Sequence, residues 1–343
     1  MSDEPPRRAT TLRRAVLALV TLVVVGVSFG LVLPMLAPYA AVWHEVRDVS
    51  TPWRVALLGA VVLNLCTFAL PWMIALPGLG FVRALLVTQA STAFTLVVPG
   101  GAPAGMAVSY AGLRKSGYGA SEVAPAVALT GLWNQLSTFV FPGVAFAVLV
   151  AGGARNGGVA TIALVGIVLF AVVAAALVAA LANERLAQSA GDRAGAALSR
   201  VAAVLGRRPT RLRGDAVVGF RRDSLELLRR RWHALTAATL ANQLTGYLIL
   251  VIALFAVGVA RTEVGIRESF AAWSVGRLVS TIPVTPGGIG YTEVGLTGVL
   301  IAFGGQRAAV VAAVLLYRAC SILPTIAVGA IATVPLSRPA RLS

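Results

Sequence analysis

The sequence predicts an all-α polytopic membrane protein with about six transmembrane helices and two re-entrant helical hairpins, arranged as an inverted repeat. Of the 343 residues, 58% are hydrophobic and only 12% are charged, a composition that excludes an ordinary soluble domain. Apolar runs of about 20 residues recur, and this length crosses the hydrocarbon core of a bilayer. Two further apolar runs contain Pro-Gly-Gly, which interrupts a helix in the middle of each run.

The charged loops set the expected orientation of these spans. Basic residues are retained on the cytoplasmic side, so residues 1–14 and 337–343 are expected to be cytoplasmic tails of a cell-membrane protein. Residues 39–52 lack a basic excess and are expected on the outer face. Basic loops account for the net charge of +16, and we do not expect nucleic acid as a partner. The six spans are expected at residues 15–37, 55–76, 122–150, 159–181, 234–259 and 308–336.

A long Arg-rich segment, residues 183–232, is expected to be a cytoplasmic loop. Within it, residues 193–205 and 217–228 alternate apolar and basic side chains at helical spacing, a pattern typical of helices that lie along an anionic leaflet. Two interpretations stay open: these helices only fix the topology, or they also recognise lipid headgroups.

The two interrupted runs are each too short in either leg to cross a membrane. Hairpin A (residues 84–115) turns at "PGGAPAG", and hairpin B (residues 269–304) turns at "TPGGIG". Each leg has about 13–15 residues and reaches roughly 20 Å at 1.5 Å per residue. Hairpin A is flanked by basic residues and is expected to enter from the cytoplasm, whereas hairpin B is expected to enter from outside.

The order of segments occurs twice, as a span, a broken hairpin and a span with a polar site. The polar site is Asn134-Gln135 in the first copy and Arg318 in the second. One extra span lies between the copies, so the second copy is expected to be inverted. Inverted repeats whose broken helices meet near the midplane are a recurring plan of transporters.

Three ionisable residues lie deep in expected membrane segments: Arg277, Glu293 and Arg318. Each is costly to insert unless it is paired, so Glu293 is expected to neutralise one arginine and to leave the other as a positive charge suited to a phosphate. The alternative is a salt bridge that only holds hairpin B to the last span. The expected substrate site adds polar and hairpin-tip residues: Pro99, Gly100, Gly101, Asn134, Gln135, Asn242, Gln243, Pro286, Gly287, Gly288, Gly290, Tyr291 and Tyr317, with Tyr247 as further polar lining.

Other chemistry finds little support. The Pro-Gly-Gly stretch of hairpin B lacks the strand-turn-helix context of a dinucleotide site. Cys66 and Cys320 lie far apart in apolar spans, and their spacing suits neither a metal site nor a disulfide framework. We therefore expect no cofactor, no metal and no catalytic residues.

Three motifs carry a resemblance: "PVTPGGIGYTEVGL" (283–296), "LLYRACSILP" (315–324) and "VVPGGAPAG" followed by "LRKSGYG". With these, the chain resembles the transmembrane region of bacterial lysylphosphatidylglycerol synthases, the flippase-like family, over residues 15–336. The resemblance implies translocation of an anionic or phosphate-bearing lipid between leaflets. Because only a few residues follow residue 336, the chain is expected to lack the soluble aminoacyl-transfer domain of the bifunctional relatives and not to synthesise aminoacyl lipid. It also lacks any charge at 99–109, where many relatives carry an arginine and a glutamate.

Three functions therefore stay open. A lipid translocase is favoured, acting on a phospholipid or a polyprenyl-phosphate-linked lipid. A secondary transporter of a small solute or ion would use the same inverted plan. A membrane enzyme that acts on a lipid phosphate is disfavoured, because no pair of acidic residues flanks an expected cavity.

Overall fold

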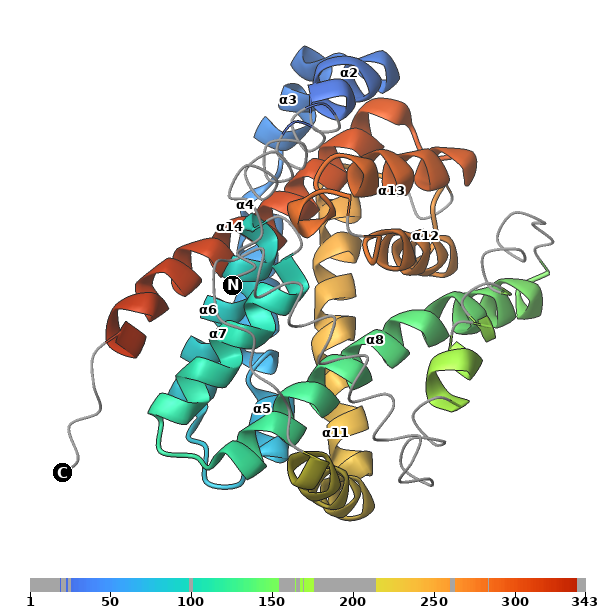
Figure 1. Ribbon diagram of the computed structural model, residues 1–343. Coiled ribbons are helices and arrows are strands. Elements are labelled where there is room, and N and C mark those ends of the chain that lie inside the picture. The colour runs from blue at the N-terminus through green and yellow to red at the C-terminus, as the bar shows by residue number, and fades with distance from the viewer. Residues whose placement is uncertain are drawn as a thin grey trace, which may run out of the picture.

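The structure, a computed structural model, describes residues 26–98, 101–153, 170–175, 214–259, 263–282 and 284–337, with positions 19, 23, 164, 167 and 168 (Figure 1). These residues form helices and turns, and no strand occurs among them. Four of the helices are long and apolar enough to cross a membrane, and a fifth crossing is possible if one bent pair is a single span. The chain is therefore an all-helical polytopic membrane protein. The expected span 159–181 and the tail 1–14 lie almost wholly outside the described residues.

The segment expected on the outer face, residues 39–52, contains a helix. A short π-helical turn, η1 (Ser28–Val32), and α2 (Leu33–Leu36) end the first span, and α3 (Tyr39–Arg47) follows at an angle of 76°. Ala37 is extended because the next residue, Pro38, disfavours helical geometry before it. Val42 and Val46 lie one helical turn apart and pack against the core, which explains why this segment is helical.

The second span and hairpin A occur where the sequence predicts them. Helix α4 (Thr51–Thr67) continues into α5 (Leu70–Ala75), and α6 (Phe81–Val97) and α7 (Gly101–Lys115) form the two legs of hairpin A. The legs pack directly on each other, as Figure 1 shows. Gly101 and Gly105 of α7 lie against Thr95 of α6, where a Cβ atom would collide, so glycine permits this close approach.

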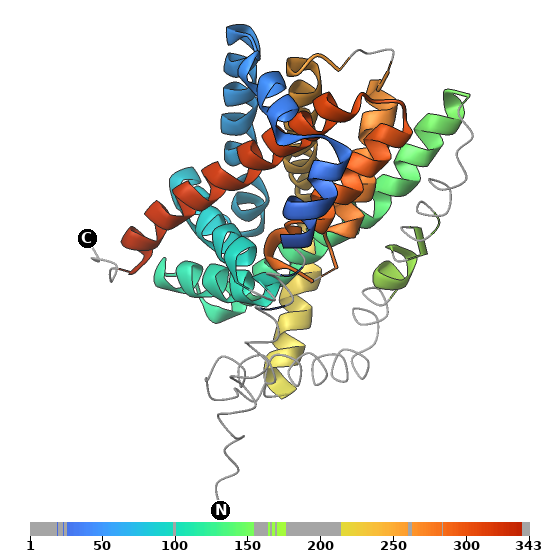
Figure 2. The ribbon, with the colours of Figure 1, turned by 90° about the horizontal axis from the view of Figure 1, so that it is seen from above.

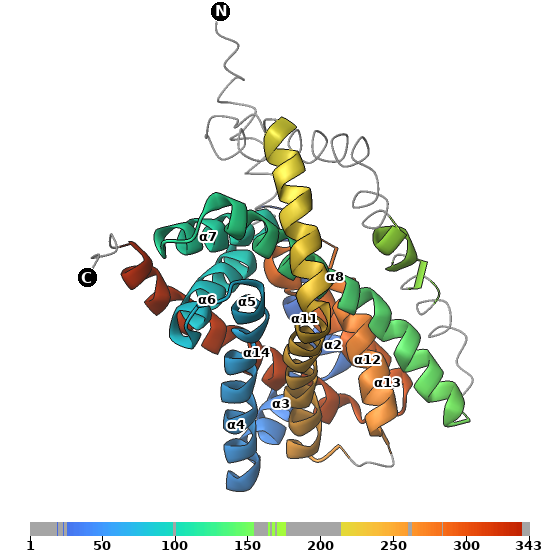
Figure 3. The same ribbon diagram turned by 90° about the horizontal axis from the view of Figure 1, so that it is seen from below.

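The Arg-rich segment differs from its prediction over the part that is described. Helix α11 (Gly214–Ala256) has 43 residues and runs without a break from the basic segment into the expected fifth span. The expected surface helix 217–228 is therefore the first part of a transmembrane helix, and Figures 2 and 3 show this yellow part extending beyond the other helices. Residues 229–233 contain neither proline nor glycine, and three of them are arginines, which favour a helix, so nothing there stops it.

Hairpin B and the two longest remaining helices complete the bundle. Hairpin B consists of α12 (Ile266–Val279), a turn that contains the single 3-10 turn η2 (Pro286–Gly288), and α13 (Tyr291–Ala302). The remaining helices are α8 (Ala120–Ala151) and α14 (Arg307–Ser337). Helix α8 packs against α7 and α12, whereas α14 packs against α13 and α6. Each long helix thus follows one hairpin in the chain and contacts the first leg of the other hairpin (Figure 1).

Segments expected on the cytoplasmic side lie together at one end of the bundle. The guanidinium of Arg231, in α11, donates a hydrogen bond to the carbonyl of Ile74 at the end of α5 (3.1 Å). The hydroxyl of Tyr118, between α7 and α8, donates to the carbonyl of Pro77 (3.4 Å). Hairpin A begins and ends at this end of the bundle.

Segments expected outside lie together at the opposite end. Gly152, at the end of α8, lies against the side chain of Arg267 in α12, and Gly304 lies near the carbonyl of Glu263. Hairpin B begins and ends here. The two hairpins therefore enter the bundle from opposite ends, and their tips meet where Gly287 packs against Leu96.

Candidate functional site

Three glycines shape the tip of hairpin B. Gly287, Gly288 and Gly290 have φ values of 62°, 69° and 99°, in the left-handed region that favours glycine. This backbone turns the carbonyl of Gly287 toward α14 and the amide of Gly290 toward the first turn of α13. The Pro-Gly-Gly-Ile-Gly turn thus directs two backbone groups, the Gly287 carbonyl and the Gly290 amide, toward a charged pair.

Glu293 and Arg318 form that pair. Nε of Arg318 donates to Oε1 of Glu293 at 2.6 Å, and the two side chains are 14% and 2% exposed. The second carboxylate oxygen, Oε2, accepts the amide of Gly290 (2.7 Å), and Nη2 of Arg318 donates to the carbonyl of Gly287 (2.9 Å). Both partners are thus held by the turn as well as by each other, and the pair fastens hairpin B to α14.

Arg277 is the arginine left without a carboxylate. No acidic side chain of the described residues lies within ion-pair distance of it, and its Nε is buried without a hydrogen-bond partner there. Its guanidinium carbon lies 6.0 Å from the centre of the Trp273 ring, at the outer limit of a cation–π contact. Glu293 thus pairs with Arg318, and Arg277 has no acidic partner among the described residues.

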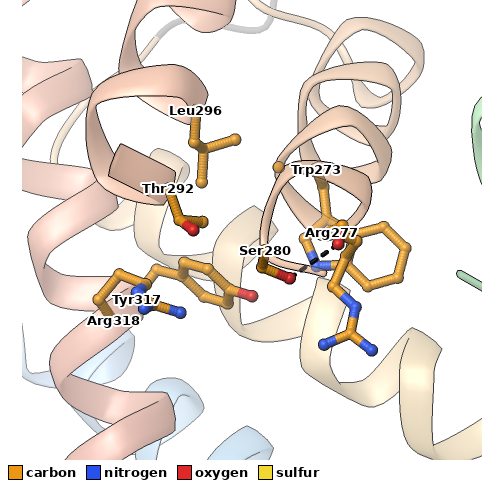
Figure 4. A pocket seen from close by; sticks show the side chains of 8 residues that line it. Trp273, Arg277, Ser280, Thr292, Leu296, Tyr317 and Arg318 are labelled. Atoms are coloured by element: carbon orange, nitrogen blue, oxygen red, sulfur yellow. Dashed lines mark hydrogen bonds between the residues drawn. The ribbon is translucent and has the colours of Figure 1, made fainter. Parts of the chain in front are cut away.

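A small cavity of about 30 Å³ lies between α12, α13 and α14 (Figure 4). Three of its lining residues bring buried polar atoms that lack a partner among the described residues: Nε1 of Trp273, Nε of Arg277 and Oγ1 of Thr292. In Figure 4 the side chains of Tyr317 and Ser280 point toward each other, and the guanidinium of Arg277 points away from them. This volume is enough for one water molecule.

A much larger cavity, of about 990 Å³, adjoins this region. It is lined by both hairpins and by α4, α5, α8, α11 and α14, and it shares Trp273, Arg277, Ser280, Tyr317 and Arg318 with the small cavity. Arg277 and Arg318 are the charged residues among its described lining, and no carboxylate occurs there. Its remaining polar lining is neutral and rich in hydroxyl and amide groups: Asn64, Thr88, Ser91, Thr92, Thr95, Ser109, Thr130, Asn134, Gln135, Thr138, Thr239, Asn242, Gln243, Thr281, Thr285, Ser321 and Thr325.

Most of the predicted site residues come together around this cavity. It is lined by Gly101, Asn134, Gln135, Asn242, Gln243, Arg277, Gly287, Gly288, Tyr317 and Arg318. Nε2 of Gln243 donates to Oδ1 of Asn134 at 2.7 Å and joins α11 to α8. Glu293 lies behind the cavity as the partner of Arg318, and Pro99 and Gly100 lie outside the described residues.

Besides Glu293, four described residues of the predicted site do not line either cavity. Pro286 and Gly290 belong to the turn itself. The hydroxyl of Tyr291 donates to the carbonyl of Ile282 within hairpin B. The hydroxyl of Tyr247 donates to the carbonyl of Ile266 (2.8 Å), near the end of the bundle where hairpin B begins. The two tyrosine hydroxyls therefore bond backbone carbonyls of hairpin B, and Pro286 and Gly290 shape its turn.

Two features of the site were not predicted from the sequence. One is the stripe Thr88, Ser91 and Thr95 on α6, whose spacing of three and four residues places it on one helix face. This spacing is visible in the sequence and could have indicated a polar wall. The other is Trp273, which the sequence alone does not distinguish from other membrane aromatics; in the structure its ring lies beside the guanidinium of Arg277.

Together these features define a class: a polytopic helical membrane protein with a polar cavity where two broken hairpins meet. The chain belongs to the family described as the lysylphosphatidylglycerol synthase TM region, whose model matches residues 17–329. This membership assigns it to a family of membrane proteins with a lipid-related role. No curated protein matches the chain.

Proposed function

We propose that this protein translocates a phosphate-bearing lipid between the leaflets of the cell membrane and catalyses no covalent reaction. The observation that carries the proposal is the guanidinium of Arg277, which has no carboxylate partner among the described residues and lines a cavity of about 990 Å³ between the hairpins. An isolated charge at membrane depth is expensive and marks a substrate pathway by default. A phosphate is the anion that a planar guanidinium binds best.

The surrounding groups support a phosphate at this position. Tyr317 and Trp273 line the same large cavity as Arg277 and bring an O–H and an N–H group to it. The Arg318 guanidinium uses Nε and Nη2 for its hydrogen bonds to Glu293 and Gly287, and it also lines the cavity. A phosphate here would meet a net positive charge in a low-dielectric setting, where charge-assisted hydrogen bonds are strong.

The arrangement of the halves supports transport. We propose that α4 to α8 and α11 to α14 form an inverted repeat, because the hairpins enter from opposite ends and each long helix packs on the other half's hairpin. In such repeats, rocking of one half against the other exposes a central site to each side in turn. The basic end of the bundle, with Arg231 and Lys115, is proposed to be cytoplasmic, as the positive-inside rule requires.

Apolar side chains at the tips support a lipid over a soluble solute. Val97 of hairpin A is 59% exposed, and Ile282 and Val284 of hairpin B are 52% and 38% exposed. Acyl or prenyl chains can lie against such side chains while the headgroup occupies the polar cavity. This arrangement matches a phospholipid, which has apolar chains and a polar headgroup.

A leaflet-resolved assay tests the proposal. Proteoliposomes would carry acyl-labelled fluorescent phosphatidylglycerol or a labelled polyprenyl phosphate, and an impermeant quencher would report the accessible fraction. We expect quenching to proceed beyond the outer leaflet in vesicles with the protein and to stop there in protein-free vesicles. Uptake of a small organic phosphate without any lipid movement would overturn the proposal and favour a secondary transporter.

A further inference from the structure

The large cavity has a charged region and an uncharged region. Arg277 and Arg318 line the charged region, and residues of α6, α8 and α11 line the uncharged region. A phosphate alone would occupy a small part of about 990 Å³, which is the upper end of the size of small-molecule sites. The uncharged region therefore has to be matched by the rest of the headgroup.

The threonine hydroxyl oxygens of the uncharged region can act as hydrogen-bond acceptors. Thr88, Thr95, Thr130, Thr138 and Thr239 each donate their hydroxyl hydrogen to a carbonyl four residues earlier in their own helix. The hydrogen is then committed, and the oxygen lone pairs stay available. This wall can accept hydrogen bonds from a ligand that carries hydroxyl groups.

Amides supply the complementary donors. The side chain of Gln135 lines the cavity and forms no hydrogen bond to another described residue, and Nδ2 of Asn134 stays available while its Oδ1 accepts from Gln243. An amide offers both donors and acceptors, as a sugar or polyol hydroxyl does. The uncharged region thus matches a neutral group with many hydroxyls.

The uncharged region is unsuited to a cationic headgroup. No carboxylate occurs in the described lining, and Glu293 is 1% exposed and already bound to Arg318. An ammonium group placed in the cavity would lose its hydration without gaining a counter-ion, and Arg277 would repel it. An aminoacyl or ethanolamine headgroup is therefore disfavoured.

We infer that the cavity selects lipids whose phosphodiester carries an uncharged, hydroxyl-rich group, that is, a polyol or a sugar. This inference rests on the proposed function and names its substrate class. The phosphate lies at Arg277, and the hydroxyl groups lie against α6 and α8. A polyol phospholipid and a sugar linked to a prenyl phosphate share this chemistry, and the experiment separates them.

Short-chain lipids in detergent test the inference by thermal shift of the full-length protein. The probes are dihexanoyl phosphatidylinositol, phosphatidylmethanol and phosphatidylethanolamine, which share the phosphodiester, together with a short prenyl phosphoglucose. We expect the inositol or the glucose probe to bind about tenfold or more tightly than phosphatidylmethanol, because several hydroxyl hydrogen bonds are added. Whichever of these two probes binds more tightly shows whether the ligand is a polyol phospholipid or a sugar linked to a prenyl phosphate. Phosphatidylethanolamine should bind more weakly than phosphatidylmethanol.

Variants of Gln135 locate the selectivity. Gln135→Met should remove most of the advantage of the hydroxyl-rich probe, and Gln135→Glu should raise the relative affinity for phosphatidylethanolamine. Ser137→Ala is the control on the same helix, because Ser137 bonds its own helix and does not line the cavity. The melting temperature without lipid shows whether each variant is folded.

The outcomes separate this inference from the proposed function. Equal binding of all phosphodiesters would overturn the polyol selectivity and leave lipid translocation standing. Tighter binding of phosphatidylethanolamine would also overturn the selectivity. If no phosphodiester binds to the wild type, the proposed function itself fails.

Discussion

Replacing Arg277 by methionine should stabilise the protein and remove its response to phosphate lipids. Arg277 has no carboxylate within ion-pair distance among the described residues, and its cation–π contact lies at the 6.0 Å limit. Inserting an unpaired arginine costs about 2.5–3.5 kcal/mol, and such a contact returns only about 1 kcal/mol. Because Arg277 lines a polar cavity rather than lipid, we expect the variant to gain about 1–2 kcal/mol, or a few degrees in melting temperature.

The matched variant, Arg318→Met, should have the opposite effect. It strands Glu293, which is 1% exposed, and loss of one partner of a buried pair costs about 3–5 kcal/mol. The two arginines, which look alike in the sequence, should therefore change the melting temperature in opposite directions.

Lipid binding provides the second half of this test. In one detergent, a short-chain phosphatidylglycerol should raise the melting temperature of the wild type and have little effect on Arg277→Met. Loss of hydrogen bonds to a charged group of about 1.5–3 kcal/mol corresponds to roughly 10–100-fold weaker binding. If Arg277→Met is as unstable as Arg318→Met, or responds to the lipid as the wild type does, the assignment of Arg277 as the free phosphate-binding cation is wrong.

Further predictions concern the pair, the turn and the topology. The double variant Glu293→Gln with Arg318→Met should recover most of the stability lost by Arg318→Met alone, yet stay impaired in the leaflet assay; full recovery of transport would leave the pair a structural salt bridge. Gly290→Ala should destabilise by about 1 kcal/mol or more because its φ is 99°, whereas Gly295→Ala, in open helical space, should be neutral or stabilising in the same melting experiment. A cysteine at Ser116, in a chain whose native cysteines are replaced, should react with an impermeant maleimide only from the cytoplasmic side, and labelling from outside would invert the proposed orientation.

The sequence predicted the breaks in the two apolar runs because the signals for a break are local. Pro-Gly-Gly within an apolar run breaks a helix wherever it occurs, and both breaks lie where the motif places them. The contact of Glu293 with an arginine was also predictable, since an unpaired buried charge is costly.

Other features depend on distant contacts that a single sequence does not reveal. The choice of Arg318 over Arg277 as the partner follows from the Gly287 carbonyl, whose direction is set by the left-handed glycines. The helix Tyr39–Arg47 forms because Val42 and Val46 pack against core residues that lie far away in the sequence. The extension of α11 is not evident from the sequence, because a run of arginines is typical of a cytoplasmic loop. Charge alone, however, does not end a helix.

The central claim is that a lipid headgroup passes through the large cavity, and blocking the cavity tests it most directly. Gly131 of α8 lines the cavity, and a Cβ atom there would meet no other atom within 4 Å, so Gly131→Trp should fill the space without disturbing the fold. Gly298→Trp is the control, because Gly298 of α13 is equally unobstructed and does not line the cavity. In the leaflet-resolved assay, we predict that Gly131→Trp reduces lipid movement to the protein-free level and that Gly298→Trp retains it. Wild-type movement in a folded Gly131→Trp protein would contradict the account.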